Sequence, residues 1–301
     1  MPGFSTRAAL LIALAGFVSL SLGDAIVKSM AGQWPGTAVA ALRYAFGALG
    51  LAVYLMVRHG RAGFVLPRPW LQFGRGAAVS LATICFFMAV MAMPLADATA
   101  IQFSSPILTA LLAPLVLKER TSAATWLATL LAFLGVLVVL RPNLLELGPV
   151  AFYPLGAAFG MSWLMMFNRK VAGGAPVAVM QFLLAAIAAP LLFGAAALLD
   201  GFGGPPFQIG WPNAAVVLKC LGVAFFATVG HTLIYAAIVR TTPQLVAPMT
   251  YVQLLVAGAL GWAWFGNAPD SATFGGAALI IAGGLWLWRS QKVPDVAETP
   301  D

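Results

Sequence analysis

Ten apolar segments, each roughly 20 residues long, follow one another along this chain of 301 residues. A helix needs about 20 residues to cross a bilayer, and hydrocarbon offers backbone groups no hydrogen-bond partner outside the helix itself. The segments are residues 8–30, 36–57, 70–92, 95–117, 123–140, 149–168, 177–199, 211–239, 243–265 and 271–289. The connections are too short for a soluble domain, so we predict an all-α integral membrane protein with ten transmembrane helices.

The composition excludes a soluble protein. Hydrophobic residues make up 61% of the chain and charged residues 8%, whereas an ordinary globular domain has roughly a quarter charged residues. The net charge of +7 does not indicate nucleic-acid binding, because the basic residues lie at the ends of apolar segments and form no patch. Cys85 and Cys220 both lie inside apolar segments, so no disulfide framework or zinc site is predicted. We expect no cofactor and no metal.

The basic residues predict an orientation in the membrane, because cytoplasmic loops are enriched in Lys and Arg. With a cytoplasmic N-terminus, twelve of the 16 basic residues fall on the cytoplasmic side and two, Lys28 and Arg141, on the other. The twelve are Arg7, Arg58, Arg61, Arg68, Arg75, Lys118, Arg120, Arg169, Lys170, Arg240, Arg289 and Lys292. We therefore predict that both termini lie on the cytoplasmic side of the membrane. The tail at 291–301, rich in acids and proline, is predicted to be disordered.

An internal repeat relates the two halves of the chain at a constant offset of 148 residues, which for instance pairs Thr83 with His231. We predict one five-helix repeat in residues 1–145 and a second in residues 146–290. Because five is an odd number, the second repeat enters the membrane from the opposite side, and the two repeats are inverted. Inverted repeats are typical of secondary transporters, whose substrate site lies near the bilayer midplane between the halves.

Two segments related by this offset carry polar and aromatic side chains on one helical stripe, at the spacing i, i+3, i+7. The stripes are Ser80, Thr83 and Phe87 in the first half and Thr228, His231 and Tyr235 in the second. His231 is the one histidine inside a predicted span, and an ionisable group at that depth is a functional candidate. The alternative is a neutral imidazole that binds a neighbouring helix.

The fourth and ninth segments are polar at corresponding positions, with Gln102 in one and Thr250 and Gln253 in the other. A buried amide needs several hydrogen-bond partners, so the glutamines are candidates for a substrate site. Pro106 and Pro248 interrupt helical hydrogen bonding and free carbonyl groups for a ligand or water. The alternative for the Ser and Thr hydroxyls is a bond back to their own helix.

Trp163, Asp24 and Arg43 are further candidates. Trp163 lies about 9 Å of helix inside the basic pair 169–170, where it forms either a stacking surface in a central cavity or an ordinary packing contact. Asp24 and Lys28, at i and i+4, are expected to form an ion pair. The alternative is that Asp24 carries a coupling proton or binds a substrate ammonium group. Arg43 either holds a carboxylate or ties helices together.

Catalytic patterns are missing from the sequence, so we do not expect an enzyme. Gly160 to Trp163 is similar to the start of an intramembrane serine protease motif, with Ser162 as nucleophile and His231 as base, but the trailing glycine is absent. A membrane-embedded hydrolase is therefore a remote alternative. Gly156 and Gly160 form a small-xxx-small face suited to close helix packing.

Taken in order, these features resemble the EamA-type ten-helix transporters of the drug/metabolite transporter superfamily, over about residues 8–290. The resemblance is carried by Ala41–Tyr44, Pro94–Ile107, Leu117–Arg120 and Gly135–Pro142. The second half departs from the family pattern with Asn267, where the first half has an acidic residue. The resemblance implies a basket-like bundle with a central cavity that moves small metabolites by alternating access.

Within the superfamily the chain is most similar to bacterial exporters of aromatic and other amino acids. The implied function is export of amino acids, aromatic or neutral, or of related metabolites, with a multidrug exporter as the alternative. The residues expected at the substrate site are Trp163, Gln102, His231, Tyr235, Thr83, Phe87, Thr250, Gln253 and Asp24. The expected partners are a small-molecule substrate and the lipid bilayer, and a monomer is the working expectation.

Overall fold

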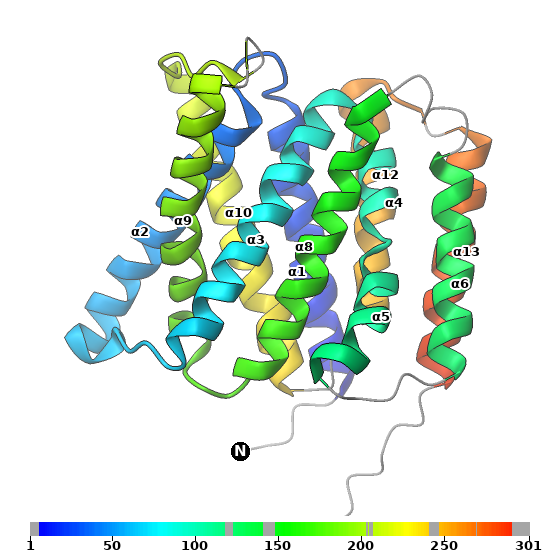
Figure 1. Cartoon of the computed structure of the whole chain (residues 1–301), viewed down its shortest axis with the longest axis horizontal. Helices are drawn as coiled ribbons and strands as arrows, with labels where there is room; N and C mark the ends of the chain where they lie inside the picture. Colours follow the sequence, from blue (N-terminus) through cyan, green and yellow to red (C-terminus); the bar gives the residue numbers. More distant parts are fainter. Residues whose placement is uncertain are drawn as a thin grey trace, which may run out of the picture.

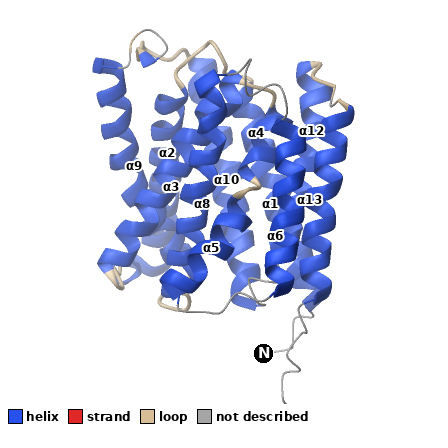
Figure 2. Ribbon diagram, turned by 45° about the vertical axis from the view of Figure 1, so that its right-hand side comes forward, coloured by secondary structure: helices blue, strands red, loops and turns tan. Residues whose placement is uncertain are grey.

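The computed structural model describes residues 6–117, 123–140, 148–202, 204, 207–240, 247–268 and 270–290, and throughout these residues it contains helices and loops but no strand (Figure 2). The predicted all-α class is therefore confirmed for the described part of the chain. The predicted tail at 291–301 lies outside it. Successive helices run up and down in alternation as one bundle, except that α5 continues in the direction of α4 (Figure 1).

The helices follow the predicted apolar segments closely. Their bounds are α1 (Thr6–Lys28), α2 (Gly36–His59), η1 (Gly60–Gly63), α3 (Pro69–Ala92), α4 (Leu95–Gln102), α5 (Ser105–Leu117), α6 (Ala123–Leu140), η2 (Gly148–Ala151), α8 (Phe152–Val171), α9 (Val177–Phe202), α10 (Ala214–Arg240), η4 (Ala247–Tyr251), α12 (Val252–Phe265) and α13 (Ser271–Ser290). Six of them, namely α1, α2, α3, α8, α9 and α10, are long and apolar enough to cross a membrane.

Local sequence signals set several helix ends. Asn213 and Asp270 precede α10 and α13, and each accepts a hydrogen bond of 2.8 Å from the backbone N–H three residues further on, as N-cap residues do. Pro69 is the first residue of α3, where its missing N–H removes no helical bond. Gly266 closes α12 in the left-handed region at φ 67°, which glycine adopts without steric cost.

The predicted segment 95–117 is not one continuous helix, because it is interrupted about a third of the way along. The helix α4 ends at Gln102 and α5 begins at Ser105, and the N–H of Phe103 lies within hydrogen-bonding distance of two carbonyl groups of α4, at 3.1 and 3.2 Å. Pro106 is the second residue of α5, so the proline that we expected to interrupt the segment lies just after the break.

Four helix pairs form the largest packing interfaces: α1 with α10, α3 with α8, α2 with α9, and α6 with α13. The pair α2–α9 lies at one end of the bundle and the pair α6–α13 at the other, with the remaining helices between them (Figure 1). The core is therefore shared by both halves of the chain, because every one of these interfaces joins a helix of the first half to a helix of the second.

Two of these interfaces depend on glycine. A Cβ on Gly160 of α8 would lie 2.6 Å from the backbone nitrogen of Ala82 in α3. A Cβ on Gly230 of α10 would lie 2.8 Å from the carbonyl oxygen of Gly16 in α1. A Cβ on Gly156 would meet a side chain of α3 at 2.9 Å. The small-residue face predicted on this segment is thus a close packing face within the chain.

Replacing Gly160 by alanine is expected to lower the unfolding temperature, because the added methyl group meets backbone atoms of α3 that cannot swing aside. The expected loss of stability is about 1–3 kcal/mol, the usual cost of overpacking. Gly194→Ala in α9 is the matched control, since nothing lies within 4 Å of a Cβ at that position. Thermal unfolding of both variants in detergent makes the comparison, and equal unfolding temperatures would contradict the close approach.

Candidate functional site

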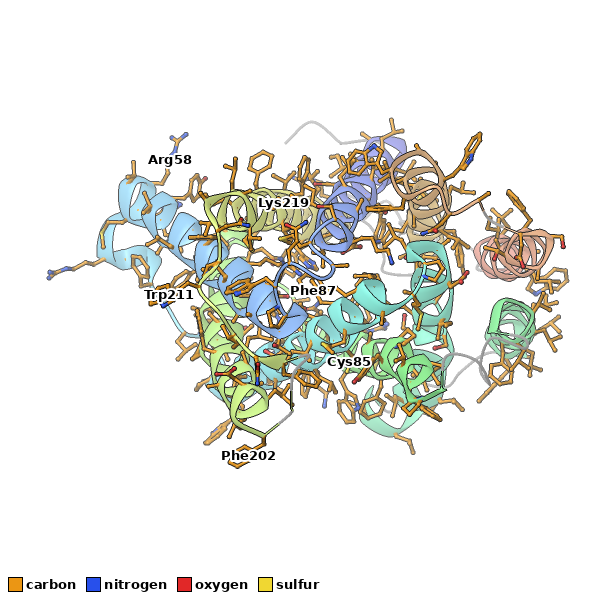
Figure 3. All side chains as sticks on the ribbon, turned by 90° about the horizontal axis from the view of Figure 1, so that it is seen from above. Arg58, Cys85, Phe87, Phe202, Trp211 and Lys219 are labelled. Carbon is orange, nitrogen blue, oxygen red and sulfur yellow. The ribbon has the colours of Figure 1, made fainter. Side chains whose placement is uncertain are left out.

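A buried arginine, Arg43 of α2, lies among aromatic rings in the interior of the bundle. Its guanidinium carbon lies 4.5 Å from the ring centroid of Tyr44 and 5.4 Å from that of Phe87 in α3. Desolvated cation–π contacts of this kind contribute about 2 kcal/mol or more. Viewed from above, Phe87 lies near the middle of the bundle (Figure 3). The two rings therefore stabilise a positive charge deep in the protein.

A small cavity lies beside Arg43, between α2, α9 and α10. Its volume is about 20 Å³, which is room for about one water molecule. Its polar lining consists of Arg43, Tyr44, Gln181, Thr228 and His231, and its other lining residues are apolar or glycine. The second stripe predicted from the repeat thus contributes two of its three residues to this cavity.

Titratable side chains on four helices interact electrostatically near the cavity. Arg43 interacts electrostatically with Asp24 of α1 and with His231 of α10. His231 also interacts with a second arginine, Arg75 of α3. These interactions connect α1, α2, α3 and α10, the helices that carry the four side chains.

The predicted ion pair between Asp24 and Lys28 is wrong. The Lys28 ammonium group instead donates a hydrogen bond of 2.6 Å to the carbonyl oxygen of Met93. Met93 follows the last residue of α3, and carbonyl groups at a helix C-terminus lack helical partners and carry partial negative charge. The long Lys28 side chain reaches this acceptor, which leaves Asp24 to interact with Arg43.

Two further hydrogen bonds connect the helices around the cavity. The hydroxyl groups of Tyr44 and Thr83 share a hydrogen bond of 3.1 Å, which joins α2 to α3. The Gln181 side-chain amide donates to the carbonyl oxygen of His231 at 3.4 Å, which joins α9 to α10. Of the predicted site residues, the structure therefore brings Asp24, Thr83, Phe87 and His231 together around Arg43, whose role the sequence left open.

The remaining predicted site residues lie in other places. Tyr235 is buried further along α10 and is grouped with Met180 of α9 in a separate apolar cluster. The Trp163 ring contacts the rings of Phe159 and Phe167 on its own helix, at centroid distances of 6.3 and 5.6 Å. Trp163 does not line the cavity beside Arg43.

Gln102, Thr250 and Gln253 belong to a second group, where α1, α4 and α12 meet. The neighbouring rings of Phe103 and Tyr251 make an edge-to-face contact at 5.7 Å. The backbone carbonyl of Gln253 lies 3.4 Å from the hydroxyl of Ser21 in α1, which donates to it. The polar positions paired by the repeat thus lie on two facing elements, beside the break between α4 and α5.

The geometry does not support a serine hydrolase. The Ser162 hydroxyl lies within hydrogen-bonding distance of the carbonyl oxygens of Ala158 and Ser105, at 2.8 and 2.9 Å. Its bonding is therefore to backbone, as expected for a serine inside a helix. In the described part of the chain, no hydrogen bond joins Ser162 to His231.

The sequence analysis missed Arg75, which it counted among the cytoplasmic charges. Arg75 is fully buried in α3. Its Nε donates to the Asn168 side chain at 2.7 Å, and its Nη1 donates to the Gln72 side chain at 2.6 Å and to the Met180 carbonyl at 3.2 Å. A signal was available, because Arg75 lies more than a helical turn inside its apolar segment, as Arg43 does.

A second, more voluminous cavity is a poor candidate for a polar substrate. It has a volume of about 700 Å³ and lies between α6 and α13, lined by Leu134, Leu137, Val138, Ser271, Ala272 and Leu279. These residues carry no charge, and the cavity is wide open to the outside of the bundle. Such a surface suits lipid chains, so the polar cavity beside Arg43 is the candidate site.

Comparison with known proteins identifies a family. The model of the EamA-like transporter family matches residues 7–141 and again residues 149–289. A crystal structure with 23% sequence identity has the same fold, with a TM-score of 0.65 over 93% of this chain and 97% of the other.

Three curated relatives illustrate the range of similar proteins. The chain is 27% identical to the pseudopaline exporter CntI of Pseudomonas aeruginosa, over 95% of this chain and 98% of the relative. It is 24% identical to an S-adenosylmethionine uptake transporter of Rickettsia prowazekii, over 93% and 92%. It is 27% identical to a riboflavin transporter of Rhizobium johnstonii, over 96% and 93%.

A double-mutant cycle should detect the contact between Arg43 and Phe87. We expect a coupling energy of about 0.5–2 kcal/mol between Arg43→Met and Phe87→Leu. The control is Phe86→Leu, which removes a ring that is also buried but makes no cation–π contact with Arg43 in the structure. Unfolding free energies measured in detergent supply the cycle, and equal coupling for the two phenylalanines would refute the contact.

Proposed function

Because the chain belongs to the EamA-like transporter family, within the drug/metabolite transporter superfamily, we propose that it exports amino acids, aromatic or neutral, or related small metabolites. Family membership by itself makes the protein a multi-pass membrane transporter of small molecules and not an enzyme. The substrate class, the direction and the route are the parts that we propose.

The observation that supports an amino-acid substrate is the arrangement of charges around Arg43. A guanidinium group binds a carboxylate through two parallel hydrogen bonds, so Arg43 suits the carboxylate of an amino acid. Asp24, which interacts with Arg43 from α1, suits the ammonium group. The rings of Tyr44 and Phe87 beside Arg43 offer apolar surface to an aromatic or neutral side chain. The three parts together match the three parts of an amino acid.

The relatives are consistent with such a substrate, and they differ in the direction of transport. One relative is an uptake transporter of S-adenosylmethionine, a compound that contains an amino-acid group with its carboxylate and ammonium. Another is an exporter, of pseudopaline. The riboflavin transporter indicates that the same fold also takes larger ring systems. Export in this chain is proposed from its resemblance to the amino-acid exporters of the superfamily.

We propose that the helices form ten spans as two inverted five-helix repeats, in residues 1–145 and 146–290. The packing supports this arrangement. Exchanging the halves turns α1 into α8, α2 into α9, α3 into α10 and α6 into α13. The interface of α1 with α10 then becomes the interface of α8 with α3, and the interfaces α2–α9 and α6–α13 map onto themselves. An arrangement with two-fold related halves has this property.

Transport requires the helices to move, because the cavity of about 20 Å³ is far smaller than the roughly 300–1,000 Å³ of a typical ligand pocket. We therefore propose alternating access, in which the cavity opens to one side at a time. In the open states, Trp163, Gln102, Thr250 and Gln253 are proposed to contact the substrate in addition to the residues around Arg43. The proposal is supported by their location on α8, which packs against α3, and at the α4–α12 contact, where α12 packs against α1.

Arg43→Gln is expected to lower transport of a labelled amino acid at least tenfold, because it removes a charged hydrogen-bond donor worth about 1.5–3 kcal/mol. Arg43→Lys is expected to retain little of the wild-type transport, since an ammonium group lacks the planar two-pronged geometry of the guanidinium group. The measurement is uptake into proteoliposomes for a panel of amino acids, with and without a pH gradient.

The control for this experiment is Arg58→Gln. Arg58 lies at the outer edge of the bundle (Figure 3), so its loss should leave transport unchanged. If no amino acid of the panel is transported by the wild-type protein, the substrate proposal fails. Transport of aromatic cations in place of amino acids would favour the multidrug alternative.

The proposed topology, with both termini in the cytoplasm, has its own test. After Cys85→Ala and Cys220→Ala, a single cysteine is placed at an exposed position in one loop, by Trp211→Cys or Arg61→Cys. A membrane-impermeant maleimide added to intact cells is expected to label Trp211→Cys and not Arg61→Cys, because the loops lie on opposite sides of the membrane. The reverse labelling pattern would overturn the orientation.

A further inference from the structure

We propose that Arg75 and Tyr235 form a second anion-binding site, which takes the substrate's carboxylate at the end of the bundle where the N-terminus lies. This inference rests on the proposed function, because it assigns a second position to the same carboxylate. It concerns residues outside the cavity beside Arg43, and it assigns a ligand to two buried donor atoms, Nη2 of Arg75 and the hydroxyl oxygen of Tyr235, that have no hydrogen-bond partner in the structure.

The hydrogen bonding of Arg75 is incomplete. Its side chain is fully buried, and a guanidinium group has five N–H donors. Nε and Nη1 use three of them on Asn168, Gln72 and the Met180 carbonyl, whereas Nη2 has no hydrogen-bond partner. A buried charged group without partners is costly, so the free side of Arg75 is a position where an acceptor would be stabilised.

The partners that Arg75 does have are all neutral. They are two side-chain oxygens of amides and one backbone carbonyl, supplied by α3, α8 and α9. Among the residues that the structure describes, no carboxylate forms an ion pair with it. The positive charge is therefore held in position by three helices but is not neutralised. A site that is preorganised in this way binds an anion without first having to release a resident one.

Tyr235 supplies the second free donor. Its ring is 5% exposed and its hydroxyl has no hydrogen-bond partner. The tyrosine packs with Met180 in one apolar cluster, and Met180 is also the residue whose carbonyl binds Arg75. Tyr235 and Arg75 also interact electrostatically. The residues that carry the two unpartnered donors, on α3 and α10, thus both lie beside Met180 of α9.

A carboxylate has the chemistry that both donors require. Its two oxygens accept hydrogen bonds from an Nη2 N–H and from a phenol O–H, and its charge neutralises the guanidinium. The stripe on α10 connects the two sites, because Thr228 and His231 line the cavity beside Arg43, and His231 also interacts with Arg75. The two proposed carboxylate positions therefore lie along the stripe of α10 that carries Thr228, His231 and Tyr235.

The experiment is thermal unfolding of the purified full-length protein in detergent, with sodium benzoate titrated against sodium chloride at equal ionic strength. Benzoate is an aromatic carboxylate and tests the anion site without a transport assay. We expect benzoate to raise the unfolding temperature, and we expect the shift to persist in Arg43→Gln. Tyr235→Phe should raise the benzoate concentration for half-maximal shift about tenfold, and Arg75→Gln should abolish the shift that persists in Arg43→Gln.

Tyr235→Phe is the decisive variant, since Arg75→Gln also removes bonds between helices and can unfold the protein. The Tyr235 hydroxyl has no partner, so its removal should not lower the unfolding temperature without benzoate. Arg58 is exposed at the edge of the bundle. The Arg58→Gln variant should therefore show the same shift of the unfolding temperature with benzoate as the wild type.

The proposal is overturned if Tyr235→Phe titrates with benzoate as the wild type does, or if chloride stabilises the protein as well as benzoate does. Loss of the whole benzoate shift in Arg43→Gln would also overturn it, and would leave the site at Arg43 standing alone. A shift that is insensitive to Arg43→Gln but weakened by Tyr235→Phe would support the second site even if the proposed role of Arg43 fails.

Discussion

A guanidinium group buried among membrane helices must find its partners on neighbouring helices, because lipid supplies none. This constraint determines how the centre of the protein is built. Arg43 makes cation–π contacts with rings of α2 and α3. Arg75 donates hydrogen bonds to oxygen atoms of α3, α8 and α9. The contacts of these two buried arginines thus join the helices that surround the candidate site.

The sequence predicted the parts of this structure that depend on short-range pattern. Apolar length located the helices, the helical period placed Thr228 and His231 on one face, and the spacing of Gly156 and Gly160 indicated a close contact. The parts that it missed depend on which helix is the neighbour. Lys28 could bind Asp24 one turn away or a carbonyl of another helix, and only the packing of α1 beside the end of α3 decides between them.

The same distinction explains the candidate site. Thr83, Phe87 and His231 were found because the repeat marks them twice, whereas Arg75 has no charged counterpart in the second half and was counted among the cytoplasmic charges. Trp163 was predicted as a site residue because it lies well inside its apolar segment, yet the rings that it contacts belong to its own helix. Depth can be estimated from a single segment, but the direction in which a side chain points depends on the helices packed around it.

The glycine contacts have a thermodynamic consequence. Ala82 and Gly230, which make the close approaches to Gly160 and Gly16, are separated by the repeat offset of 148 residues. In the proposed inverted arrangement, these two close contacts are equivalent, and each half can rotate about its own contact. Opening toward one compartment is then related by a two-fold rotation to opening toward the other, and to the extent that the two repeats are equivalent the two states have similar free energies. A carrier poised in this way needs only a small difference in ligand affinity to change its resting population.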